Sequence, residues 1–137
     1  MDKTYHLFIS HSWSYSNTYD GLINLLDKDK NFLYKNYSVP KDDPIHDAGT
    51  DKELYEAIKV QISKASVVII LAGVYATYSK WINKEIKIAK EEFVYPKPII
   101  AVEYWGSEKT SRVVKEAADK IVKWNSNSII NAIKELG

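Results

Sequence analysis

The sequence predicts an α/β fold in which helices cover both faces of a parallel β-sheet. Two apolar runs, residues 66–73 ("SVVIILAG") and 98–105 ("PIIAVEYW"), are almost unbroken, as expected for strands that are buried on both sides. Strand-like and helix-like segments alternate five times along the 137 residues. No repeat or Pro/Gly/Ser-rich linker divides the chain, so we expect one domain over residues 1–137.

The other strand-like segments are shorter or less apolar. Residues 5–10 ("YHLFIS") form the first and residues 120–124 ("KIVKW") the last. Residues 32–40 ("FLYKNYSVP") are a weaker candidate that Pro40 would close.

Five segments carry apolar residues at helical spacing. They are residues 14–29, 50–64, 78–93, 111–118 and 127–136. The second opens with Thr50 and Glu53 in capping-box register. At this chain length, the alternation favours a three-layer, flavodoxin-like sandwich whose five parallel strands have the order 2-1-3-4-5.

The composition excludes several classes of function. Nineteen basic and eighteen acidic residues leave a net charge of +1, which gives no electrostatic case for nucleic-acid binding. With no cysteine, the chain has neither disulfides nor thiolate chemistry. The three histidines, His6, His11 and His46, never take a metal-ligand spacing, so we expect no metal site.

The chain also lacks the patterns of export or membrane insertion. Its N-terminus enters a strand-like run at once and has no apolar signal-peptide core. The longest apolar run, residues 67–76, is about half as long as a membrane-spanning helix. We therefore expect a cytoplasmic protein that makes no membrane contact.

In folds of this class, ligands bind where the strands end at their carboxyl edge. The segments expected there are residues 10–14, 40–49, 73–79 and 104–109. None contains the glycine-rich phosphate loops GxxxxGK[ST] or GxGxxG, which argues against a flavin or mononucleotide carrier. The segment "SHSWS" (10–14) suits either phosphate binding or ordinary helix capping.

One glutamate in the lysine-rich segment 78–93 has unusual neighbours. On a helix, Glu85 lies beside Trp81, Ile82, Ile88 and Ala89, so that all four of its neighbours are apolar. A carboxylate in such surroundings near the carboxyl edge is typical of a functional site. The alternative is that Glu85 turns outward to water near the helix start. Glu103, at the end of an apolar strand, is the second candidate carboxylate.

Two motifs resemble those of the TIR (Toll/interleukin-1 receptor) domain. "HLFISHS" is similar to the first TIR box, and in "YSKWINKE" a serine and a tryptophan precede a glutamate as they do in TIR domains. The second-box Arg-Asp and Pro-Gly and the third-box Phe-Trp are absent. The small size, the opening "FISHSW" and the loop "YSVPKDDPI" look most like the TIR-like proteins of the bacterial Thoeris antiphage system.

This resemblance implies an enzyme that consumes NAD+ as its substrate and needs no cofactor. It implies that Glu85 is the catalytic residue and that a cyclic ADP-ribose isomer is made, which diffuses to a separate effector protein. It leaves room for a homo-oligomer. The residues expected around the substrate are Phe8, Ser10, His11, Ser12, Trp13, Tyr75 and Trp81. The leading alternative is a non-catalytic TIR-like scaffold that acts through contacts between like domains.

Overall fold

The computed structural model describes residues 3–10, 16–37, 51–72, 80–103 and 112–137. Its centre is a five-stranded sheet in which every strand is parallel to its neighbours and the order is β2-β1-β3-β4-β5. The predicted α/β class and strand order are therefore confirmed. The strands are β1 (Thr4–Ser10), β2 (Leu33–Asn36), β3 (Val67–Ala72), β4 (Ile99–Glu103) and β5 (Lys120–Lys123).

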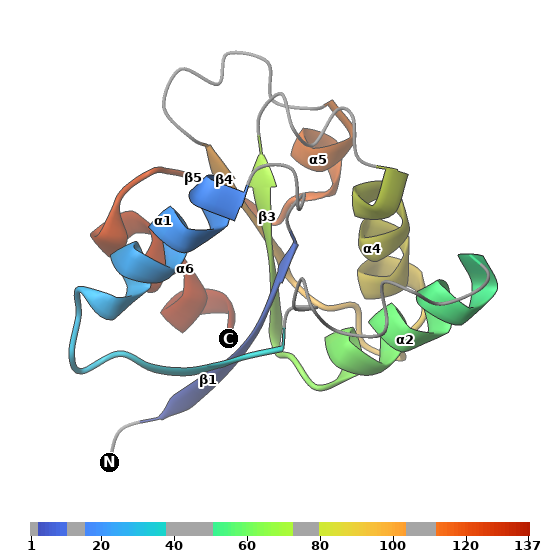
Figure 1. Ribbon diagram of the computed structural model, residues 1–137, viewed down its shortest axis with the longest axis horizontal. Helices are drawn as coiled ribbons and strands as arrows, with labels where there is room; N and C mark the ends of the chain where they lie inside the picture. The colour runs from blue at the N-terminus through green and yellow to red at the C-terminus, as the bar shows by residue number, and fades with distance from the viewer. Residues whose placement is uncertain (1–2, 11–15, 38–50, 73–79, 104–111) are drawn as a thin grey trace.

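Helices cover both faces of this sheet, as the alternation of segments predicts. They are α1 (Ser16–Asp27), α2 (Asp51–Ser63), α4 (Lys80–Glu91), α5 (Arg112–Ala117) and α6 (Ser126–Leu136). Figure 1 shows α1 and α6 on one side of the strands and α2, α4 and α5 on the other. No helix within the described ranges is long and apolar enough to cross a lipid bilayer.

The central strand β3 is buried on both faces, which explains its unbroken apolar sequence. Its residues Val67 to Ile70 are all 0% exposed. Because side chains alternate along a strand, they feed two separate cores. Val68 and Ile70 pack with Phe8 of β1 on the side of α2 and α4. Val67 and Ile69 pack on the side of α1 and α6.

Where the predicted and the observed end of an element both lie in the described residues, they differ by at most two residues. Within the described part of the fragment 32–40, residues 33–36 form the edge strand β2, which pairs with β1, and residues 38–40 lie outside the described residues. The helix predicted over 78–93 ends at Glu91, and the chain then turns back so that the Lys97 amide donates to the Ala89 carbonyl at 2.8 Å. By contrast, α6 begins at Ser126, one residue before the predicted start at residue 127. The Asn125 side chain accepts a hydrogen bond of 2.8 Å from the Ser128 amide and so caps the helix there.

The carboxyl-terminal end of α4 is tied to its neighbours by polar contacts. Glu92, just past the helix, accepts a hydrogen bond of 2.6 Å from the Tyr55 hydroxyl of α2 and pairs with Lys59 at 3.2 Å. Lys90 pairs with Asp119 at 2.5 Å, and Asp119 also accepts from the Ile99 amide at the start of β4. Partial burial raises the pKa of Asp119, but these two hydrogen bonds outweigh it and leave that pKa below its ordinary value. These ties join α2, α4 and β4 at the edge where the strands begin.

The contact between Tyr55 and Glu92 leads to a prediction about titration. The hydrogen bond to the Glu92 carboxylate, followed by desolvation, raises the pKa of Tyr55 from 10.0 to about 12. A raised folded-state pKa means that the contribution to stability is complete below the unfolded pKa of 10.0 and is lost as the pH rises through about 12. We expect Glu92→Gln to return the Tyr55 pKa toward 10, because the charged acceptor is removed. Carbon-13 NMR of the Tyr55 ring during an alkaline titration measures this. The same Tyr55 midpoint in both proteins would contradict it.

Candidate functional site

Glu85 is buried in the second turn of α4. Its residue is 7% exposed, and it is the only buried polar or charged residue among those whose burial the structure describes. The alternative that this side chain turns outward to water is therefore wrong. One carboxylate oxygen, Oε2, accepts no hydrogen bond from the described residues, although the residue does have another polar interaction.

The buried residues that follow Glu85 in α4 are apolar and pack toward the sheet. Ile86, Ile88 and Ala89, which follow it in the helix, are 8%, 0% and 0% exposed. They belong to the same core as Phe8 of β1 and Ile70 of β3. Taking a carboxylate out of water into such a core costs several kcal/mol unless the protein compensates. A position that carries this cost suits a side chain kept for its chemistry.

Glu85 lies in the half of α4 that points to the carboxyl edge of the sheet. The hydrogen bond between the Lys97 amide and the Ala89 carbonyl places the end of α4 beside the start of β4. The helix therefore runs antiparallel to the strands, and Figure 1 shows it standing alongside them. Glu85 is one turn above Ala89, about 6 Å nearer to the strand ends. This is the edge at which ligands bind in open parallel α/β sheets.

The second candidate carboxylate, Glu103, has an ion-pair partner. It ends β4, and its Oε1 atom lies 3.1 Å from the Lys123 ammonium at the end of β5. Strand register sets this pair, since Glu103 and Lys123 are direct neighbours across the two strands. The sequence pattern singled out Glu103 but not Lys123, because only the register of two distant segments shows that they meet.

The structure describes only part of the predicted substrate-binding set. Phe8 is 1% exposed and packs inside the core beneath α4, so its observed role is packing and its contact with a ligand stays a prediction. Ser10 ends β1 and Trp81 is the second residue of α4, but their side chains lie outside the described part of the molecule. The remaining members fall outside the described residues altogether: His11, Ser12, Trp13 and Tyr75.

No group of three or more histidine, aspartate or glutamate side chains with a geometry suited to a metal ion occurs within the described ranges. The feature of the described residues that stands out chemically is therefore the buried carboxylate on α4.

The parallel sheet of order 2-1-3-4-5 defines a flavodoxin-like α/β domain, and Glu85 of α4 is its buried carboxylate among the residues whose burial the structure describes. The family model "Thoeris protein ThsB, TIR-like domain" matches residues 8–109, about three quarters of the chain. The chain belongs to this family, which confirms the resemblance drawn from its two motifs. The match includes Phe8 and Glu85, and residues beyond it add β5 and α6 to the same sheet and core.

A solved structure shares the fold. The CMP N-glycosidase BcmB of Clostridium botulinum is similar with a TM-score of 0.51 over 95% of this chain and 98% of that chain, at 10% sequence identity. At this identity the likeness concerns the fold alone. No curated protein sequence matches the chain.

Proposed function

We propose that this protein is an NAD+-consuming enzyme that cleaves the bond between nicotinamide and ribose. Glu85 is its catalytic residue, and a cyclic ADP-ribose isomer is its product. In this proposal, the product is a second messenger of antiphage defence in the cytoplasm that activates a separate effector protein. Membership of the Thoeris TIR-like family supports the class of activity. The fold is also one that a CMP N-glycosidase uses, so it is compatible with breaking an N-glycosidic bond.

The observation that carries the proposal is the burial of Glu85. A non-catalytic scaffold has no evident need for a carboxylate that is only 7% exposed on a helix packed against an apolar core, because burying a charge costs stability. An enzyme that must stabilise a cation gains from it. A negative charge in surroundings of low polarity interacts more strongly with a developing positive charge than it would in water.

The chemistry requires one carboxylate. When the bond between the pyridinium nitrogen and ribose C1′ breaks, its electron pair goes to the nitrogen and nicotinamide leaves as a neutral molecule. No general acid is needed, because the leaving group is already cationic. Positive charge develops at C1′ as in glycoside hydrolysis, and Glu85 stabilises it while holding the ribose hydroxyls.

The fate of the C1′ cation decides the second product. If a water molecule attacks and loses its proton, ADP-ribose results. If water is excluded, a nucleophilic atom of the same ADP-ribose unit attacks C1′, loses its proton where it carries one, and closes a ring. The proposed cyclic messenger is the product of this intramolecular attack.

The test is nicotinamide release from NAD+ by concentrated protein, with the products separated by chromatography. The wild type is compared with Glu85→Gln and with Glu91→Gln, which changes an exposed glutamate of the same helix. We expect release by the wild type and by Glu91→Gln only, with a cyclic product of the same mass as ADP-ribose less one water. If release is absent, the assay is repeated in lysate of phage-challenged cells. Silence there as well would favour the scaffold, for which Glu85→Gln makes no difference.

A further inference from the structure

The ion pair between Glu103 and Lys123 lies at the carboxyl edge of the sheet, on the same side as Glu85. Along β4, Ile99 and Ala101 face the core beneath α4, whereas Ile100 and Val102 face the opposite core. Because side chains alternate along a strand, Glu103 faces the side of α4 and α5. In register, it is the neighbour of Ala72, the last residue of β3.

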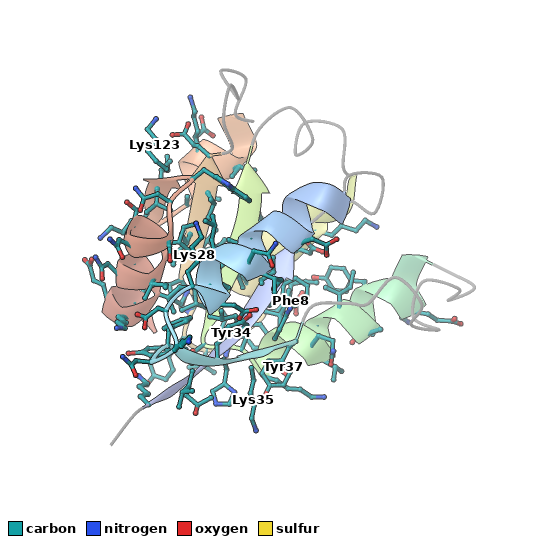
Figure 2. The ribbon with its side chains drawn as sticks, turned by 60° about the vertical axis from the view of Figure 1, so that its left-hand side comes forward. Phe8, Lys28, Tyr34, Lys35, Tyr37 and Lys123 are labelled. Atoms are coloured by element: carbon teal, nitrogen blue, oxygen red, sulfur yellow. The ribbon has the colours of Figure 1, made fainter. Side chains whose placement is uncertain are left out.

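The two partners of this pair differ in exposure. The Glu103 side chain is 19% exposed, whereas the Lys123 side chain is 82% exposed. Figure 2 shows Lys123 at the end of the molecule to which the strands point. An ion pair with so exposed a lysine contributes little to stability, about 0–1 kcal/mol. The pair places one positive and one negative charge side by side at the edge where ligands bind.

Glu103 is too far from Glu85 for both to hold the same ribose. Starting from the contact between Ala89 and Lys97, Glu85 is four residues along a helix, whereas Glu103 is six residues along an extended chain. At about 1.5 and 3.3 Å per residue, Glu103 lies on the order of 10 Å farther toward the strand ends. Such a separation exceeds one sugar ring and fits within the length of a dinucleotide.

We propose that Glu103, which is paired with Lys123, binds the ribose hydroxyls of the adenosine half of the substrate and sets its preference for NAD+ over NADP+. An acidic residue near the end of a strand holds the 2′-hydroxyl in the same manner in dinucleotide-binding α/β folds. In NADP+ a phosphate takes the place of the 2′-hydroxyl. The Glu103 carboxylate then faces a negative group that donates no hydrogen bond, so NADP+ is disfavoured. This inference rests on the proposed NAD+ chemistry and adds a residue that selects the substrate.

The experiment measures kcat and KM for NAD+ and for NADP+ in four proteins: wild type, Glu103→Gln, Lys123→Gln and Lys120→Gln. Lys120 is the matched control, because it forms a lysine–glutamate pair with Glu135 at the opposite end of β5. We expect Glu103→Gln to lower the NAD+/NADP+ ratio of kcat/KM about tenfold, mainly through KM, because one charge-dependent contact is lost. Lys123→Gln raises the ratio, because it removes a cation that would attract the 2′-phosphate of NADP+, and Lys120→Gln leaves it unchanged.

The outcomes separate this inference from the proposed function. If the wild type cleaves NAD+ but Glu103→Gln keeps the wild-type ratio, the assignment of Glu103 is overturned and the proposed function stands. If the wild type cleaves neither dinucleotide, in lysate of phage-challenged cells as well, the proposed function fails, and calorimetric binding of NAD+ and NADP+ to the same variants decides the inference. The inference is supported if the wild type binds NAD+ more tightly than NADP+ and Glu103→Gln binds the two equally. Equal binding to wild type and variant, or no binding, overturns it.

Discussion

Replacement of Glu85 by glutamine is expected to lower nicotinamide release from NAD+ by a factor of about 10²–10³ or more, while the protein stays folded. The substitution keeps the volume and removes the negative charge. Loss of one preorganised electrostatic contact to a transition state typically reduces kcat by this factor. The loss should appear in kcat rather than in KM, because the charge acts on the cation that forms only in the transition state.

Unfolding measurements make this result specific to the chemistry. The neutral amide of Glu85→Gln avoids the cost of burying a charge, so we expect the free energy of unfolding to stay the same or to rise. Urea denaturation followed by circular dichroism gives this value. Glu91→Gln, on the exposed face of α4, should match the wild type in both assays. Full activity in Glu85→Gln would show that another group stabilises the transition state.

The largest expected effect on stability comes from the centre of the sheet. Ile69 lies in β3, is 0% exposed, and is the direct neighbour of Ile9 in β1 and Ile100 in β4. Replacing it by alanine leaves a cavity that flanking strands on both sides cannot easily close. We expect Ile69→Ala to lower the free energy of unfolding by about 3–5 kcal/mol, toward the upper end for such substitutions. Chemical denaturation of the two proteins measures the difference.

The same substitution at the edge of the sheet is its control. Ile121 of β5 is 43% exposed, so truncation there removes little buried surface. We expect Ile121→Ala to cost no more than about 1 kcal/mol. Similar losses at Ile69 and Ile121 would mean that the two faces of β3 are not packed as described.

The fold could be predicted because its decisive features are local in the sequence. The unbroken apolar runs of β3 and β4 follow from burial on both faces, and the alternation with amphipathic segments then leaves few topologies. The edge strand β2 is harder to predict from the sequence, because its strand conformation depends on pairing with β1 as well as on its own residues. Two observed helix ends also differ from the predicted ones. The cap at Asn125 sets the start of α6, and the turn after Glu91 sets the end of α4.

The candidate site was predictable only in part. Helical spacing showed that Glu85 has apolar neighbours on its own helix, but whether the side chain is buried depends on what packs across from it. That required the position of α4 on the sheet. The partnership of Glu103 with Lys123 joins residues twenty positions apart and depends on strand register. The predicted contacts of His11, Ser12, Trp13 and Tyr75 stay predictions.

The polar ties of α4 described above have a consequence for how this chain can evolve. The contacts of Tyr55, Glu92, Lys90 and Asp119 hold the end of the helix where the strands begin, whereas Glu85 lies toward the other end. Substitutions at these ties are therefore expected to change the stability of the domain while leaving the position of the carboxylate unchanged, so this chain can vary there without losing its site.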